Sequence, residues 1–372
     1  MSSSTLTRTP PPSRSRRRRT ATRVLAAVVA AVVVPAAIVG TPGTASALTT
    51  RNRADAGAGW LGRQLSADHV IVGAFGPDYG LTADVVLALD SAGVGRVAAR
   101  EATTSLTRHV LDYTGFGDPA EFFAGSFAKL LNVAAAQRTD PRHFGGSARK
   151  NLIATLRSLE CGSGRRATCP AADDGRFSDI STFGDFSNTI GQSLALIGLE
   201  RTTATGPSTR SVIYLRHQQC SNGAFPLELS TAGCTASVDA TAFAVQALLA
   251  HGTRKATAAA LDGAAWLRRH QNGNGSFTGN GVRNTNSTGL AAQALRAAGR
   301  HKAADEAVMW IRSLQVMCGG QPANRGKIRY AKTASGDPIR ATSQAVPALA
   351  AVGLVDISNA GSIRELPRLR CS

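Results

Sequence analysis

The sequence lacks the cysteine and histidine spacing of an ordinary zinc site. None of its six cysteines forms a CxxC pair, and its seven histidines have no spacing that would place two of them on one metal ion. We therefore predict no metal ligands. Acidic residues are also scarce, with 24 Asp and Glu against 42 Lys and Arg and a formal net charge of +18 at pH 7.

The first 47 residues have the organisation of an export signal. The basic run Arg16 to Arg19 precedes a small-apolar stretch from Val24 to Gly40, and Ala45-Ser46-Ala47 follows as an A-x-A cleavage pattern. We predict cleavage between Ala47 and Leu48 and a secreted or wall-associated protein. A retained membrane anchor is the alternative, but Pro35 interrupts the apolar run. The sequence leaves open whether export follows the Sec or the twin-arginine route.

The basic charge favours anionic partners. Segment 1–47 carries seven arginines and no acid, so the net charge after its removal is +11. Outside the cell the anionic partners are cell-wall polymers and lipid headgroups, and no nucleic acid is expected. A solvated basic surface without a specific partner is the alternative.

All six cysteines follow the predicted cleavage point, and an even number in an exported chain implies three disulfides. Nearness in sequence favours two local bridges, and the remaining two cysteines would tie the tail back. The predicted pairs are Cys161 with Cys169, Cys220 with Cys234, and Cys318 with Cys371.

Five segments repeat a pattern in which Leu follows Thr by seven residues, or two helical turns. The pairs are Thr82 with Leu89, Thr189 with Leu196, Thr241 with Leu248, Thr288 with Leu295 and Thr342 with Leu349. In four of them Gly stands four residues beyond the Leu, at Gly93, Gly252, Gly299 and Gly353, where a helix C-cap favours a left-handed residue. Each segment predicts one Ala-rich helix of about four turns.

A second helix with larger apolar residues and Arg precedes each Ala-rich helix. The predicted ranges are 56–65, 151–159, 211–218, 262–270 and 305–314, and a degenerate pair, 105–113 with 126–136, makes six pairs. The Ala-rich helices are apolar almost all round and predict an inner ring, whereas the Arg-bearing helices predict an outer ring with one wet face. We therefore expect an all-α, monomeric (α/α)6 toroid in one domain, 48–372, with a tail from about residue 355.

The loop that follows the fifth outer helix carries a resemblance. Gln271-Asn272-Gly273-Asn274-Gly275-Ser276-Phe277 resembles the Gln-x-x-Asp-Gly-Ser-aromatic turn of the squalene cyclase and prenyltransferase repeat superfamily. Weaker copies begin at Gln219 and Asp174. The resemblance spans residues 54–354 and implies a terpenoid cyclase-like toroid, a fold that serves several activities.

The reaction motifs that this superfamily uses are missing. There is no Asp-x-Asp-Asp motif, no Asp, Cys and His zinc set and no Gly-Cys-Gly-Glu-Gln thioester. The toroid domain of cobalamin carriers is distantly similar, but a second domain closes over the ligand in those carriers, and this chain stops about 20 residues beyond its sixth inner helix.

Polar residues near the starts of the inner helices are the candidate ligand-binding residues, because parallel inner helices present their amide ends at one mouth. They are Thr82, Asp84, Asn188, Gln192, Asp239, Thr241, Gln246, Asn284, Thr288, Gln293, Arg340 and Gln344. Helix capping is the competing interpretation for the Thr and Asn residues.

We therefore predict a non-catalytic protein that binds a small, lipidic or anionic ligand at this mouth. The first alternative is an extracellular enzyme, of the terpenoid cyclase or prenyltransferase class or acting on glycans, with Asp84, Asp239 or Glu228 as acid and base. The second alternative is a cobalamin carrier.

Overall fold

The computed structural model describes residues 48–145, 151–229 and 233–371. Leu48 is therefore described, whereas Ala47 and the rest of the predicted export signal lie outside the described residues. Residues 46–372 form one compact unit. Within its described part, no helix is long and apolar enough to cross a bilayer.

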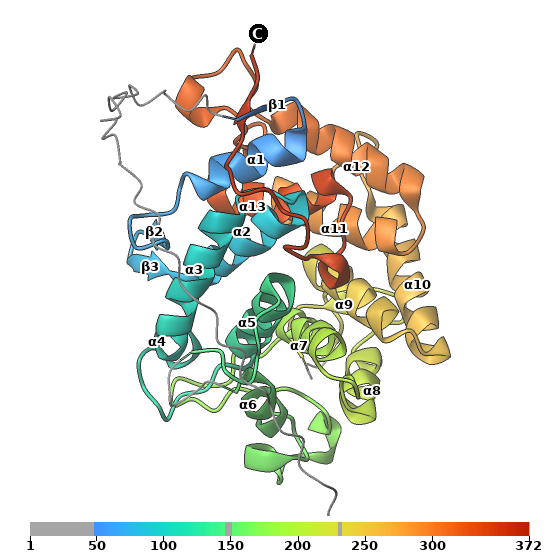
Figure 1. The fold of residues 1–372 in the computed structure, drawn as a ribbon. Helices are drawn as coiled ribbons and strands as arrows, with labels where there is room; N and C mark the ends of the chain where they lie inside the picture. The colour runs from blue at the N-terminus through green and yellow to red at the C-terminus, as the bar shows by residue number, and fades with distance from the viewer. Residues whose placement is uncertain (1–47, 146–150, 230–232, 372) are drawn as a thin grey trace, which may run out of the picture. The chain divides into compact units, whose positions relative to one another are not determined.

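Six Ala-rich helices form a closed inner ring in which each helix packs against two neighbours, and the last packs against the first (Figure 1). In ring order they are α2 (Tyr79–Ala92), α5 (Ala124–Gln137), α7 (Thr189–Thr202), α9 (Val238–His251), α11 (Thr285–Ala297) and α13 (Pro338–Ala350). Small residues allow close approach. A Cβ added at Gly289 of α11 would lie 2.5 Å from the Gln344 carbonyl oxygen of α13.

The outer helices surround this ring (Figure 1). They are α1 (Arg53–Gly62), α3 (Arg96–Arg108), α6 (Leu152–Ser158), α8 (Thr209–His217), α10 (Arg254–His270) and α12 (His301–Leu314), and α4 (Val110–Gly115) follows α3. The predicted all-α toroid of six helix pairs is thus confirmed.

Short two-stranded pairings and 3-10 turns complete the described structure. The pairings are β1 (Thr49–Thr50) with β8 (Arg368–Leu369), β2 (Ile71–Gly73) with β3 (Gly76–Asp78), β4 (Phe225–Pro226) with β5 (Ala236–Ser237), and β6 (Thr278–Gly279) with β7 (Val282–Arg283). The turns are η1 (Gly164–Arg166), η2 (Ala171–Asp173), η3 (Pro322–Asn324) and η4 (Leu354–Asp356).

Several predicted helix boundaries were wrong. Helix α10 begins at Arg254 instead of Asp262. Its first half is Ala-rich and lacks the larger apolar residues on which the prediction of the outer helices was based. Helix α1 begins at Arg53, where the Asn52 side chain caps the amides of Ala54 and Asp55. Gly93 and Gly252 are left-handed caps as predicted, whereas α13 is capped by Ala351 at φ 59° and Gly353 is extended.

The repeated threonine joins each inner helix to the loop before it. The Thr241 hydroxyl donates to the Ser237 carbonyl oxygen at 2.6 Å and accepts from the Phe225 amide at 2.9 Å. Thr82, Thr288 and Thr342 make the same pair of bonds, to a carbonyl four residues back and to a loop amide. The repeat therefore holds a loop against the helix that follows it.

Helix α7 uses a different residue in this position. Thr189 is the first residue of α7, whereas the repeated threonine is the fourth residue of α2, α9 and α11 and the fifth of α13. The sequence pairing of Thr189 with Leu196 was therefore out of register. The fourth residue of α7 is Gln192. Its Oε1 accepts from the Phe177 amide at 2.9 Å, and its Nε2 donates to the Gly175 and Ser211 carbonyls.

Glutamines at the ends of three outer helices link each helix to the next one. Gln271 Nε2 donates to Gly275 O at 3.0 Å and to Ala303 O in α12 at 2.8 Å, as the resembling turn implies. Gln219 repeats this geometry toward α10. Gln315 donates to Gly326 O and, at 2.9 Å, to Arg53 O in α1. Gln315 therefore closes the outer ring by joining the last outer helix, α12, to the first, α1.

The three disulfides join the predicted partners. Cys161 bonds Cys169, Cys220 bonds Cys234, and Cys318 bonds Cys371, with Cα separations of 5.9, 5.7 and 5.4 Å. The third bridge anchors the tail beside η3 of the last repeat.

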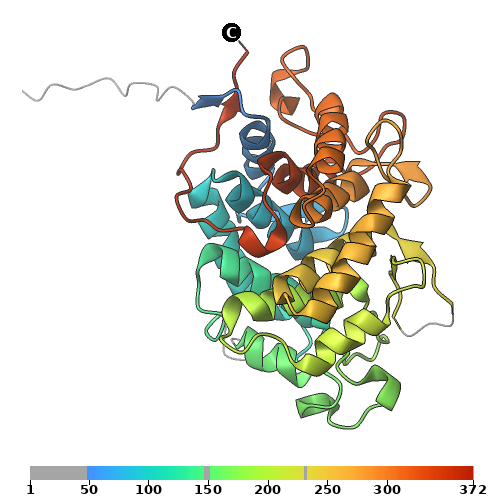
Figure 2. The same ribbon diagram turned by 90° about the vertical axis from the view of Figure 1, so that its right-hand side faces the viewer.

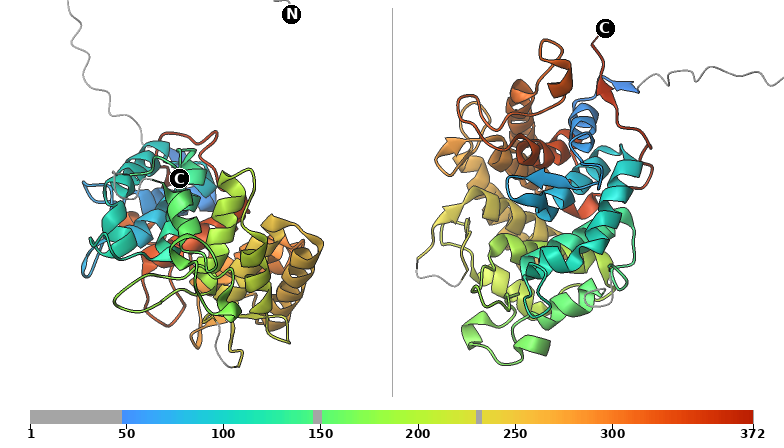
Figure 3. Two further views of the ribbon diagram at one scale, coloured as in Figure 1. Left: turned by 90° about the horizontal axis from the view of Figure 1, so that it is seen from below. Right: turned by 90° about the vertical axis from the view of Figure 1, so that its left-hand side faces the viewer.

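The C-terminal tail covers the C-terminal ends of the inner helices. The Leu354 amide donates to Gln246 of α9, the Asn359 amide to Ala136 O of α5, and the Ile363 amide to Gly93 O after α2. The tail then returns to the start of the described chain, where β8 pairs in parallel with β1 (Figures 2 and 3). One end of the inner ring is thereby closed.

Candidate functional site

A cavity of about 190 Å³ lies inside the inner ring, and all six inner helices line it. We call it the central cavity. Leu354 and Ile357 of the tail form its floor. Its other lining residues are Asp84, Leu87, Lys129, Ile190, Leu194, Asp239, Phe243, Leu290, Gln293, Arg340, Ser343, Gln344 and Pro347.

One ion pair stands in the wall of the central cavity. Lys129 Nζ of α5 lies 2.8 Å from Asp84 Oδ1 of α2, and both side chains are largely buried. Burial lowers the pKa of Lys129, but attraction to Asp84 and Tyr113 outweighs this effect and the net change is upward. The lysine is therefore a fixed cation neutralised by its partner.

Asp239, at the start of α9, has no such partner. Burial raises the pKa of its carboxyl, and a hydrogen bond with Ser287 opposes the change only in part. Its Oδ1 is sealed from solvent without a hydrogen-bond partner in the described structure. Burial thus makes ionisation of this carboxyl less favourable than that of an exposed one.

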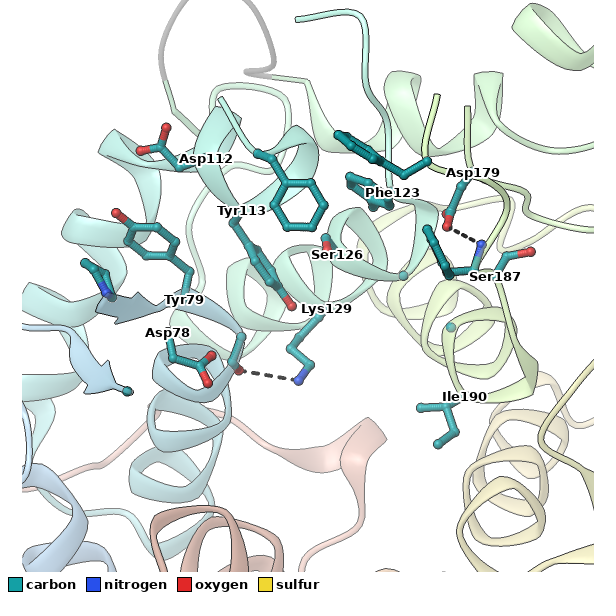
Figure 4. A pocket seen from close by; sticks show the side chains of 18 of the residues that line it. Asp78, Tyr79, Asp112, Tyr113, Phe123, Ser126, Lys129, Asp179, Ser187 and Ile190 are labelled. Atoms are coloured by element: carbon teal, nitrogen blue, oxygen red, sulfur yellow. Dashed lines mark hydrogen bonds between the residues drawn. The ribbon is translucent and has the colours of Figure 1, made fainter. Parts of the chain in front are cut away.

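A second cavity, of about 990 Å³, opens at the N-terminal ends of α2, α5 and α7, and we call it the mouth cavity. Lys129, Ile190 and Leu194 line both cavities, so the two cavities are neighbours. Figure 4 shows Tyr113, Ser126 and Lys129 on one side of it and Ile190 on the opposite side.

Aromatic rings dominate the mouth cavity. Phe116, Phe183 and Phe186 are 72, 65 and 60% exposed, and the Phe116 ring contacts those of Phe123 at 4.8 Å and Phe183 at 6.0 Å. Phe75 stands fully exposed at the turn between β2 and β3. Four exposed phenylalanines at one opening form an apolar patch of the kind that is common at interaction and ligand-binding surfaces.

The amides at the inner-helix starts, which the sequence suggested for anions, already have acceptors. Asp78, Asp337 and Ser237 cap α2, α13 and α9, and Asn188 and Asn284 cap α7 and α11. At α5, the Asp179 carboxylate accepts from the Ala124 amide at 2.7 Å. With three of these caps carboxylates, the mouth is poorly suited to an anion.

The structure separates the twelve predicted ligand-binding residues into three groups. Asp84, Asp239, Gln293, Arg340 and Gln344 line the central cavity. Gln246 holds the tail at the closed end of the ring. Fold-holding hydrogen bonds occupy the side chains of Thr82, Asn188, Gln192, Thr241, Asn284 and Thr288, although Asn188 also lines the mouth.

Sequence reasoning missed Lys129 and the aromatic residues of the mouth. Helix α5 lacks the repeated threonine, so it was passed over, yet Lys129 is the one lysine in the six inner helices and a buried lysine needs a partner. The aromatic residues come from irregular loops, where no periodic pattern shows which side chains converge. Among the described residues, no group of three or more His, Cys, Asp or Glu side chains could hold a metal ion.

No protein-family model and no curated protein sequence matches this chain. Solved structures do resemble it. A variant of the type II terpene cyclase MstE from Scytonema, in complex with geranylgeranyl dihydroxybenzoate, is 16% identical with a TM-score of 0.58, over 81% of this chain and 96% of the cyclase.

Two further structures cover 80% of this chain. The unsaturated glucuronyl hydrolase of Bacillus sp. GL1 is 12% identical with a TM-score of 0.53 over 95% of its length, and a protein from Actinoplanes is 18% identical with a TM-score of 0.53 over 98%. At these identities the likeness concerns the fold alone. The chain is an α/α toroid, similar in fold to a terpene cyclase and to a glycosaminoglycan-degrading hydrolase.

Proposed function

We propose that this chain is an exported toroid protein that binds a lipidic, isoprenoid-like ligand in the mouth and central cavities and leaves it chemically unchanged. The observation that carries the proposal is that the aromatic-rich mouth cavity adjoins the central cavity, with Lys129, Ile190 and Leu194 lining both. Ligand pockets of such volume are lined mostly by apolar and aromatic side chains.

Export rests on the sequence pattern of residues 1–47, and three disulfides are typical of proteins outside the cytoplasm. The capped helix starts favour an uncharged or apolar ligand over the anionic one that the sequence suggested. The terpene cyclase of similar fold supports the choice of ligand class, because its bound substrate carries a geranylgeranyl chain. Recruitment to an anionic wall polymer by the basic surface stays a sequence prediction.

The test is equilibrium binding of farnesene, an uncharged isoprenoid hydrocarbon, to the mature chain. Ile190→Trp puts a larger ring where the two cavities adjoin. We expect it to weaken farnesene binding about tenfold or more, because the ring occupies the ligand's space. Ile213→Trp is the matched control, since Ile213 lies on α8, away from both cavities, and is already 40% exposed. Absence of farnesene binding, or equal losses in both variants, would overturn the proposal.

Acid catalysis on the bound ligand is the second candidate, and Asp239 favours it. Burial raises the pKa of the Asp239 carboxyl, and a raised pKa suits a carboxyl to act as a general acid. The chain is incubated with farnesene, farnesol or cobalamin, the last for the carrier alternative. Mass spectrometry then shows whether the added molecule is bound unchanged or converted to a product. A product that forms with the wild type and disappears with Asp239→Asn would make the chain an enzyme.

A further inference from the structure

Four residues that line the central cavity each carry a buried oxygen without a hydrogen-bond partner in the described structure. The oxygens are Asp84 Oδ2, Asp239 Oδ1, Gln293 Oε1 and Gln344 Oε1, from α2, α9, α11 and α13. The described residues contain twelve buried side-chain atoms of this kind, so one third of them stand around one small cavity. A buried acceptor left without a donor is costly, and such a cluster therefore indicates a donor that binds there.

Other contacts orient two of these side chains, Gln293 and Asp84. Gln293 is 97% buried, and its Nε2 donates to Gly289 O at 3.2 Å and to Gln344 O at 3.3 Å, which assigns Oε1 as the atom without a partner. Lys129 holds the other oxygen of Asp84. Each side chain thus retains acceptor capacity that the protein does not use.

The charges around the cavity select among donors. The Asp84 carboxylate and the Lys129 ammonium neutralise each other, and Arg340, whose Nη2 lies 4.0 Å from Asp78 Oδ2, adds a second cation to the wall, so the Asp84 carboxylate is not left unpaired for a ligand ammonium group. Four acceptor oxygens equally disfavour a carboxylate or phosphate. A neutral donor, a hydroxyl group, fits both conditions.

We propose that the central cavity receives the hydroxyl group of an isoprenoid alcohol whose hydrocarbon chain lies in the mouth cavity. This inference rests on the proposed function and narrows its ligand class. Because each oxygen is sealed from solvent, contact with the hydroxyl needs a small rotation of a terminal side-chain torsion. The hydroxyl hydrogen can satisfy one oxygen, and its lone pairs can accept from Arg340.

The experiment compares four probes that share one fifteen-carbon skeleton: farnesol, farnesylamine, farnesoic acid and farnesene. We expect farnesol to bind about five- to tenfold more tightly than farnesene, as one hydrogen bond to an otherwise unpaired acceptor provides. Gln344→Leu removes one acceptor and should lower the ratio of farnesol affinity to farnesene affinity toward one. Its melting temperature should equal or exceed that of the wild type, because an unpaired buried oxygen is replaced by an apolar group.

Gln64→Leu is the matched control, because it is the same substitution away from both cavities. Gln64 lies just beyond the end of α1, and its Nε2 donates to Trp60 O. Farnesene binding without a farnesol preference would overturn this inference alone, as would tighter binding of the amine or the acid. Failure of all four probes would overturn the proposed function together with it. A crystal structure with farnesol whose hydroxyl lies in the mouth, with only water near Gln293 and Gln344, would also contradict the inference.

Discussion

Asp90 should make the stability of the toroid depend on pH near neutrality. Its side chain, near the end of α2, is 3% exposed, and both carboxyl oxygens accept from Gln137 Nε2 at 2.7 Å. Burial raises its pKa from 3.8 to about 7, against the opposing effects of Gln137 and Arg201. Arg201 also holds Ile357 O of the tail, so this cluster supports the floor of the central cavity.

The sign follows from proton binding. Between pH 3.8 and about 7 the folded chain keeps a proton on Asp90 that the unfolded chain has lost, so the free energy of unfolding falls as pH rises through this window and levels above it. At about 1.4 kcal/mol per pH unit, the contribution is about 4 kcal/mol. Asn mimics the protonated acid and should remove this dependence.

The assay is urea unfolding of the wild type and Asp90→Asn at several pH values from about 4 to 8. We expect the unfolding free energy of Asp90→Asn minus that of the wild type to increase by several kcal/mol as the pH rises across this range. Asp68→Asn, at an exposed carboxyl, should show no comparable trend. A pH-independent difference between wild type and Asp90→Asn would refute the reasoning.

Three further substitutions test the mouth and the ring closure. Phe116 lies in the left-handed region at φ 51°, so Phe116→Gly should raise the free energy of unfolding by about 1 kcal/mol while it weakens farnesene binding. Ala351→Gly, at φ 59° and away from the mouth, should raise stability, measured by calorimetry, without changing farnesene binding; equal changes in farnesene binding in the two variants would contradict this. Gln315→Ala removes the hydrogen bonds to the Arg53 and Gly326 carbonyls and should cost about 1 to 3 kcal/mol in urea unfolding; a loss under 0.5 kcal/mol would show that the link is dispensable.

The ring architecture was predictable because its signals are periodic. Thr241 and Thr288 repeat at one helical position, and the Gln271 turn marks where an outer helix ends, so six pairs could be counted from sequence. The register of α7 could not, because Gln192 replaces threonine with a longer side chain that reaches the same loop amide. Short-range cysteine spacing was sufficient for two disulfides, and the third followed as the remaining pair.

The candidate site was only partly predictable. Asp84, Asp239 and Arg340 stood out as charges in apolar helices, and the structure brings them to one cavity. Their partners depend on helix rotation and loop paths. The pairing of Lys129 with Asp84 joins two repeats, and the tail that supplies Ile357 as a floor residue has no repeat pattern.

The most direct test of ligand binding is native mass spectrometry of the mature chain mixed with farnesol, followed by denaturation and analysis of the released molecule. We expect a one-to-one complex that releases unchanged farnesol, and that is lost in Ile190→Trp but kept in Ile213→Trp. No complex, or release of a chemically altered product, would contradict a binding protein that leaves its ligand unchanged.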